Sequence, residues 1–171
     1  NFLRLVKKRG QDKLSRLWAR STLESQQVIR QTVSSTIFLL QGYPPLKFSH
    51  LYRMTDDVGI FQHANFDMPN KKEGYTLDDN ARALIVMTQK HKIKPEKKTL
   101  EYIYLYLSFV HYAYRGNGIF RNFMGFDRRW LEEHGSEDSH GRAIWALGFT
   151  YYNFKQEATG LIAETILLDI F

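Results

Sequence analysis

The chain contains two acidic pairs that each come a few residues before an Arg-Ala dipeptide. They are Asp78-Asp79 before Arg82-Ala83 and Glu137-Asp138 before Arg142-Ala143. Each arginine follows one of the acids by four residues, so in a helix a carboxylate would lie one turn before a guanidinium. Apolar residues at helical spacing follow both pairs. The acids therefore fall at helix starts, where unpaired amides and the helix dipole favour negative charge.

Paired carboxylates beside aromatic and arginine side chains are what sugar binding and glycoside cleavage require. One carboxyl group protonates the leaving oxygen, another activates water or attacks the sugar, and aromatic faces stack on pyranose rings. Asp79 and Glu137 are our catalytic candidates, because each is displaced around its helix from the acid that faces the arginine. For Asp78 and Asp138 the alternative is structural, an N-cap combined with a bridge to the arginine.

Two long stretches, residues 50–75 and 115–136, precede these acidic helices without a clear periodicity. Loops of this length in a compact domain usually carry binding groups. Asp56 and Asp57 stand before Gly59, so a simple Asx turn is an equally good interpretation of that pair. Together with the helix starts, the loops supply the predicted substrate-binding residues, which are Asp57, Gln62, His63, Asp78, Arg82, Asp127, Arg128, Trp130, Asp138 and Arg142.

The sequence predicts neither a metal site nor a cofactor. The six histidines form no pair with the spacing of a zinc site, and there is no EF-hand loop. Phosphate-cradling glycine loops and a Gly-x-Ser-x-Gly nucleophile motif are also missing from the sequence.

An internal repeat organises this part of the chain. Gly59-Ile60-Phe61 recurs as Gly118-Ile119-Phe120, and an acidic pair followed by Arg-Ala comes about twenty residues after each copy. A second match at a fixed further offset makes chance an unlikely cause. We place the two copies at about residues 50–107 and 108–171.

The repeat fits helical hairpins separated by long loops. Apolar spacing predicts helices over about 12–41, 78–91, 100–114 and 137–154 and a final one near the C-terminus, and it predicts no strand. The fold class is therefore all-α. Hairpins with long loops at one end indicate a partial α/α toroid, in which inner helices carry acidic residues at their starts.

Composition bounds the remaining possibilities. The 171 residues are 43% hydrophobic and 15% aromatic, which predicts one globular domain over 1–171. No apolar run reaches the roughly 18 residues of a membrane span. The net charge of +6 comes without a base-stacking or recognition-helix motif, so we do not expect nucleic-acid binding. The lack of cysteine is compatible with a cytoplasmic location.

The ends of the chain suggest a fragment of a longer polypeptide. The sequence begins at Asn1 without a methionine and ends within the apolar pattern of residues 161–171. An incomplete toroid would expose apolar surface at its ends, and we expect such ends to allow pairing into a homodimer.

Two blocks carry a resemblance to a known group of proteins. They are MTDDVGIFQHANFDMPNKKEGYTLDDNARALI and FRNFMGFDRRWLEEHGSEDSHGRAIWALG. Over about residues 50–148 they resemble the α-helical region that follows the catalytic domain in bacterial glycosyltransferases, a region similar to the six-hairpin toroids of glycoside-processing enzymes. The resemblance implies a role in carbohydrate processing, with mannose-type sugars. It also implies a glycosyltransferase catalytic domain in the same or a partner chain.

Three hypotheses follow. The first is a carbohydrate-binding helical domain associated with a bacterial glycosyltransferase. The second is a glycoside hydrolase or lyase that uses Asp79 or Glu137 as acid or base. The third is a helical protein-interaction module in which the acid–arginine pairs only stabilise hairpins. The first two predict a cleft lined by both loops, whereas the third predicts acids that are fully paired.

Overall fold

The computed structural model describes residues 46–171, and the helix expected over 12–41 lies outside the described residues. Residues 47–171 form one compact unit, and a single domain over the whole chain stays a prediction. No helix of the described part is long and apolar enough to cross a membrane. Its elements, in chain order, are α3 Ser49–Arg53, β1 Ala64–Asn65, β2 Met68–Pro69, the 3-10 helix η1 Lys71–Glu73, β3 Tyr75–Thr76, α4 Leu77–Ile93, α5 Lys97–Ala113, β4 Tyr114–Gly116, β5 Ile119–Phe120, β6 Phe123–Met124, α6 Glu137–Asn153 and α7 Ala158–Ile170.

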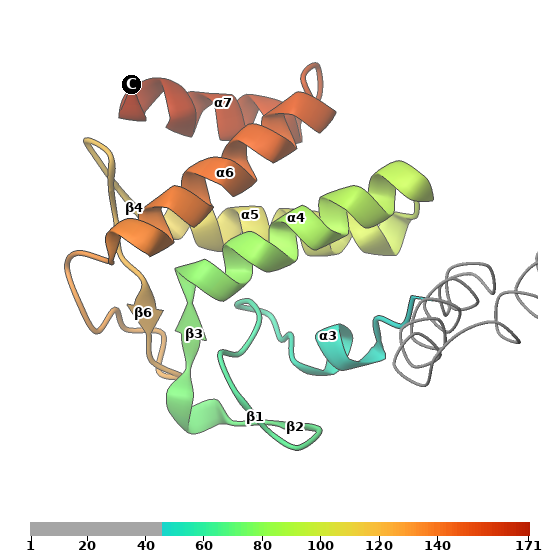
Figure 1. Ribbon diagram of the computed structural model, residues 1–171, viewed down its shortest axis with the longest axis vertical. Helices are drawn as coiled ribbons and strands as arrows, with labels where there is room; N and C mark the ends of the chain where they lie inside the picture. The colour runs from blue at the N-terminus through green and yellow to red at the C-terminus, as the bar shows by residue number, and fades with distance from the viewer. Residues whose placement is uncertain (1–45) are drawn as a thin grey trace, which may run out of the picture. The chain divides into compact units, whose positions relative to one another are not determined.

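The described part is mostly helical, as predicted, and is built from two helical hairpins. Helix α4 packs against both α5 and α6, and α6 packs against α7. Figure 1 shows α4 and α6 at the front, with α5 behind α4 and α7 beside α6. Each hairpin buries one apolar side of its helices, and the fully buried core includes Leu84, Met87, Ile103, Tyr106, Val110 and Leu147. A toroid would need further hairpins, so that architecture remains a prediction.

The prediction that the chain has no strand was wrong. Within residues 46–171, six short strands form three two-stranded antiparallel sheets, namely β1–β2, β3–β6 and β4–β5. In the β3–β6 sheet Tyr75 pairs with Met124 and Thr76 with Phe123. This pairing holds the second long loop against the start of α4.

Glycine at position 74 is required by this sheet. Gly74 has φ +64°, and a Cβ there would lie 2.1 Å from the main-chain oxygen of Met124. Only glycine fits both the backbone conformation and the close approach. The residue therefore lets the chain turn out of η1 and enter β3 directly beside β6.

Buried polar contacts fasten the first loop to the hairpin core. The Thr55 hydroxyl lies 2.7 Å from the Tyr106 hydroxyl on α5. Tyr75 donates a hydrogen bond of 2.6 Å to Asp56 Oδ2. Burial raises the pKa of both tyrosines, and the hydrogen bond to Asp56 raises the pKa of Tyr75 further. The phenols consequently stay protonated and keep the loop in place at ordinary pH.

Candidate functional site

The first turn of α4 is capped by Thr76, directly after the first long loop, and by Asn122 of the second long loop. Thr76 is the N-cap, and its hydroxyl accepts the N–H of Asp79 at 3.1 Å. Asn122, from the second loop, accepts the N–H of Leu77 with its main-chain oxygen at 2.8 Å and that of Asp78 with Oδ1 at 3.1 Å. Asn122 is buried. The second loop therefore positions the acidic pair on α4.

The first turn of α6 is built in a similar way, with Ser136 as the N-cap. The Ser136 hydroxyl accepts the N–H of Ser139 at 3.2 Å. The N-caps are thus Thr76 and Ser136, and the alternative that Asp78 and Asp138 would be N-caps was wrong. The second half of that alternative, the bridge from each acid to the arginine four residues later, was correct.

The acid–arginine pairs also join α4 to α6. Arg142 Nε on α6 lies 2.9 Å from Asp138 Oδ2 on its own helix and 2.6 Å from Asp78 Oδ1 on α4. Arg82 Nη2 contacts the other oxygen of Asp78. The hydrogen bond to Asp138, with the added charge of Asp78, raises the pKa of Arg142. Asp78 is therefore shared between two arginines on two helices.

Asp79 is less free than the sequence suggested. Its Oδ1 accepts a hydrogen bond of 2.9 Å from Arg82, and its Oδ2 accepts one of 2.6 Å from the Thr76 hydroxyl. Glu137 is exposed and has no hydrogen bond or ion pair within the described part of the chain. No contact of the structure joins the two catalytic candidates.

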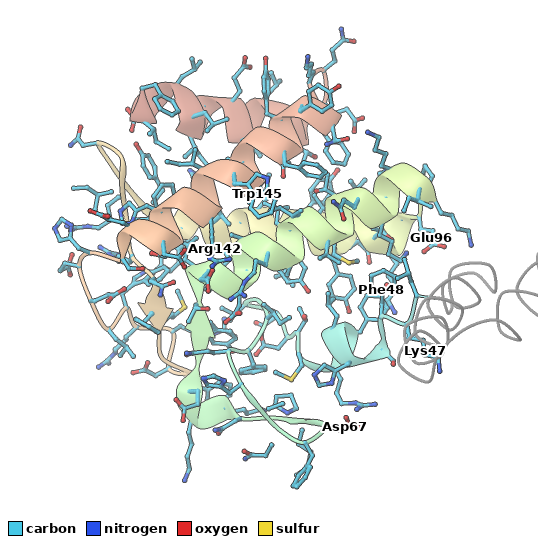
Figure 2. All side chains as sticks on the ribbon, viewed as in Figure 1. Lys47, Phe48, Asp67, Glu96, Arg142 and Trp145 are labelled. Atoms are coloured by element: carbon cyan, nitrogen blue, oxygen red, sulfur yellow. The ribbon has the colours of Figure 1, made fainter. Side chains whose placement is uncertain are left out.

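Trp145 extends this surface along α6 and was not among the predicted binding residues. Its side chain is 60% exposed, three residues beyond Arg142. Gly141 and Gly148 stand on either side of it along the helix, and a Cβ on either would meet nothing within 4 Å. Figure 2 shows Arg142 and Trp145 along the border between α6 and α4. The two flanking glycines were the signal that could have identified an open indole.

We call this surface the α4–α6 face. Helical spacing places its residues on one side of each helix, and the Asp78–Arg142 contact joins the two sides. The face combines an exposed aromatic ring with two acids and two guanidinium groups that pair with one another. It consists of Asp78, Arg82 and Val86 of α4 and Asp138, Arg142 and Trp145 of α6.

Acids of the first long loop have separate roles. Asp57 forms an exposed ion pair of 2.6 Å with Arg128, 71 residues further along the chain, which joins the two loops. The hydrogen bond from Arg128 to Asp57, together with the charge of Asp57, raises the pKa of Arg128. Asp56 Oδ1 accepts the N–H groups of Val58 and Gly59, which confirms the Asx-turn interpretation for Asp56 but not for Asp57.

The remaining predicted binding residues are not gathered with the α4–α6 face by any contact of the structure. Asp127 Oδ1 accepts the N–H of Arg129 in a second Asx turn. Trp130 is half-buried, and its ring packs against Phe109 and Tyr112. Gln62 and His63 make no side-chain hydrogen bond among residues 46–171.

No group of three or more His, Cys, Asp or Glu among the described residues is arranged to hold a metal ion. Comparison of the sequence with models of protein families, and with curated proteins, gives no match. The function of the chain must therefore be argued from the site itself.

Proposed function

We propose that the chain binds carbohydrate at the α4–α6 face. The observation that carries this proposal is the exposed indole of Trp145, which lies next to the Asp78–Arg142–Asp138 ion pairs. Sugar rings present an apolar C–H face that stacks on aromatic rings, and hydroxyl groups that hydrogen bond to carboxylates and guanidinium groups. An open aromatic ring bordered by such groups offers both kinds of contact within one surface.

The association with a bacterial glycosyltransferase, and the mannose-type sugar, belong to the same proposal and rest on the resemblance of residues 50–148. We further propose that α4 and α6 are inner helices of an α/α toroid. Their direct packing, with α5 and α7 as the second helix of each hairpin, supports that arrangement. In such a toroid the α4–α6 face would line the central cleft.

Binding without cleavage is favoured over hydrolysis or elimination. Arg82 and Thr76 occupy the two oxygens that Asp79 would have to offer as acid or base. The Glu137 side chain is exposed and has no hydrogen bond or ion pair in the described part, so no contact there orients it. The hydrolase or lyase hypothesis would therefore depend on one acid that is already occupied and one that no contact of the described part orients.

The test is calorimetric titration of the full chain with manno- and gluco-oligosaccharides, repeated on two matched aromatic variants. We expect Trp145→Ala to lose roughly tenfold or more in affinity, as truncation of an aromatic anchor usually does. Tyr104→Ala removes an exposed aromatic side chain from α5 and should leave affinity unchanged. Equal affinities for wild type and Trp145→Ala would sink the proposal.

A second measurement separates binding from catalysis. The same oligosaccharides are incubated with wild type, Asp79→Asn and Glu137→Gln, and new reducing or unsaturated ends are measured. We expect no turnover by any of the three proteins. Turnover by wild type that either variant abolishes would establish the enzyme hypothesis. Folded protein with neither binding nor turnover would favour the interaction module.

A further inference from the structure

A polar pocket, with a volume of about 550 Å³, lies at the end of α5 and shares no residue with the α4–α6 face. It is formed by the last turns of α5, by β4 and by the first residue after β5. Its lining residues are Ser108, His111, Tyr112, Tyr114, Arg115 and Arg121. Two guanidinium groups therefore face one open pocket that also offers an imidazole, a hydroxyl and aromatic rings.

Arg121 is held in this pocket without using its hydrogen-bonding capacity. The side chain is 22% exposed, and its guanidinium carbon lies 5.6 Å from the centre of the Trp130 ring. Its Nε is buried and has no hydrogen-bond partner, and its Nη2 comes no closer than 3.6 Å to Glu133 Oε2. Buried donors without a partner are uncommon and costly in proteins. The cation–π contact fixes the group, and its outer guanidinium nitrogens make no hydrogen bond within the described part of the chain.

Glu133 occupies the position where such a partner would bind. Its Oε2 lies 2.8 Å from Arg115 Nη1 and 3.6 Å from Arg121 Nη2, so one carboxylate oxygen serves both arginines. The Glu133 side chain is 66% exposed. Ion pairs of exposed side chains are weak and cheaply broken. An incoming oxyanion could therefore displace this carboxylate and take both guanidinium groups in bidentate fashion.

The α5 C-terminus does not oppose an anion strongly, although the end of a helix dipole is negative. Tyr114 N–H bonds to the oxygens of Val110 and His111, and Arg121 N–H bonds to the oxygen of Ala113 at 3.0 Å. These bonds occupy the carbonyl groups of Val110, His111 and Ala113 in the last turn of the helix. The Tyr114 hydroxyl is likewise taken, because it donates to Asp169 at 2.5 Å. Ser108, His111 and Tyr112 remain as polar groups for the rest of the ligand.

We infer that this pocket is a binding site for an oxyanion, a carboxylate or phosphate carried by a small polar ligand, and that Glu133 is a built-in competitor for it. Arg115 and Arg121 would bind the oxyanion after Glu133 moves aside. Tyr112 would cover a ring attached to the anion, since its side chain is well exposed beside Trp130. An acidic or phosphorylated sugar has this combination of groups.

The inference is tested by calorimetric titration of the full chain with inorganic phosphate, with glucuronate and with glucose as the uncharged comparison. We expect one saturable site for an oxyanion, and we expect glucose not to compete for it. Binding of phosphate alone assigns a phosphate group, and binding of glucuronate alone assigns a carboxylate. Absence of binding by both wild type and Glu133→Gln would overturn the inference.

Matched variants separate a built site from general charge. Arg121→Gln should weaken binding roughly tenfold or more, as expected for loss of a charge-assisted hydrogen bond, whereas Arg129→Gln removes an exposed arginine outside the pocket and should have no effect. Glu133→Gln should tighten binding up to about fivefold, and Asp169→Asn, which removes a nearby carboxylate that contacts neither guanidinium group, should do less. The inference would be overturned if Arg121→Gln and Arg129→Gln changed the affinity equally. Equal changes by Glu133→Gln and Asp169→Asn would also overturn it. None of these results bears on the α4–α6 face, which its own variants test.

Discussion

Asn80 and His140 make the same two contacts in the two copies of the repeat. Asn80 Oδ1 accepts the N–H of Ile60 at 3.0 Å, and its Nδ2 donates to the oxygen of the N-cap Thr76 at 2.8 Å. His140 Nε2 accepts the N–H of Phe120 at 3.0 Å, and its Nδ1 lies 2.7 Å from the oxygen of the N-cap Ser136. In both copies the side chain reaches back twenty residues to the Gly-Ile-Phe segment. An amide and an imidazole thus make corresponding contacts in the two copies.

This equivalence predicts the effect of substitutions at His140. His140→Ala leaves the Phe120 N–H without a partner and should lower the free energy of unfolding by about 1–3 kcal/mol. His140→Asn should recover most of that loss, because Asn80 shows that an amide can make both bonds. Urea unfolding followed by circular dichroism measures both. His134→Ala, at an exposed position, is the control, and an Asn variant as unstable as the Ala variant would disprove the equivalence.

Glu96 should make stability fall in acid. Hydrogen bonds from Lys90 and Lys94, with their charges, lower the pKa of Glu96 from 4.5 to about 2 in the folded protein. Because the folded pKa lies below the unfolded one, the stabilisation is fully present above about pH 4.5 and is lost as the pH falls toward 2. Glu96→Gln should therefore flatten this part of the stability profile. Thermal melts of both proteins between pH 2 and 6 would show it, and parallel profiles would contradict the prediction.

Two helical glycines should respond to alanine in opposite directions. At Gly160 on α7 a Cβ would lie 1.9 Å from the main-chain oxygen of Phe154, whereas at Gly148 on α6 it would meet nothing. Gly160→Ala should destabilise the protein by about 1–3 kcal/mol or more through overpacking. Gly148→Ala should stabilise it by about 0.5–1 kcal/mol, since alanine is the better helix former. Denaturant unfolding measures both changes in the free energy of unfolding. If both substitutions changed it in the same direction, the α6–α7 packing would differ from that described.

Asp78 should couple more strongly to Arg142 than Asp138 does, although only Asp138 shares its helix. Asp78 is the more buried acid and also binds Arg82, which restricts its motion. Double-mutant cycles of Asp78→Asn and of Asp138→Asn with Arg142→Gln measure the two coupling energies. We expect both to shrink in 1 M salt, the exposed pair more completely. A larger coupling energy for Asp138 would contradict this prediction and would mean that Arg142 pairs mainly within α6.

The helices after residue 46 were predictable because their apolar spacing and their stop signals agree. The predicted helix over 78–91 is observed as Leu77–Ile93 and that over 137–154 as Glu137–Asn153. The strands were not predictable from any pattern, because each is two or three residues long. Their pairing depends on tertiary packing of loops that are distant in sequence, as in the strand pairing of Tyr75 with Met124.

The charged part of the candidate site was predictable and its aromatic part was not. Spacing of four residues identified the bridges from Asp78 to Arg82 and from Asp138 to Arg142. It could not show that Arg142 also reaches Asp78 on another helix. Trp130 was among the predicted binding residues and Trp145 was not, because the exposure of each ring depends on which neighbours pack against it and residue spacing does not show those neighbours.

Asn122 makes the first repeat copy dependent on the second. The first copy does not supply all the acceptors for the start of its acidic helix, since the first amides of α4 donate to a residue of the following copy. An excised α4–α5 hairpin would therefore have a frayed start of α4. Adding the separately expressed second copy would be needed to restore the first turn of that helix. Growth of such a protein by duplication would favour the addition of whole copies in register, each one completing the one before it.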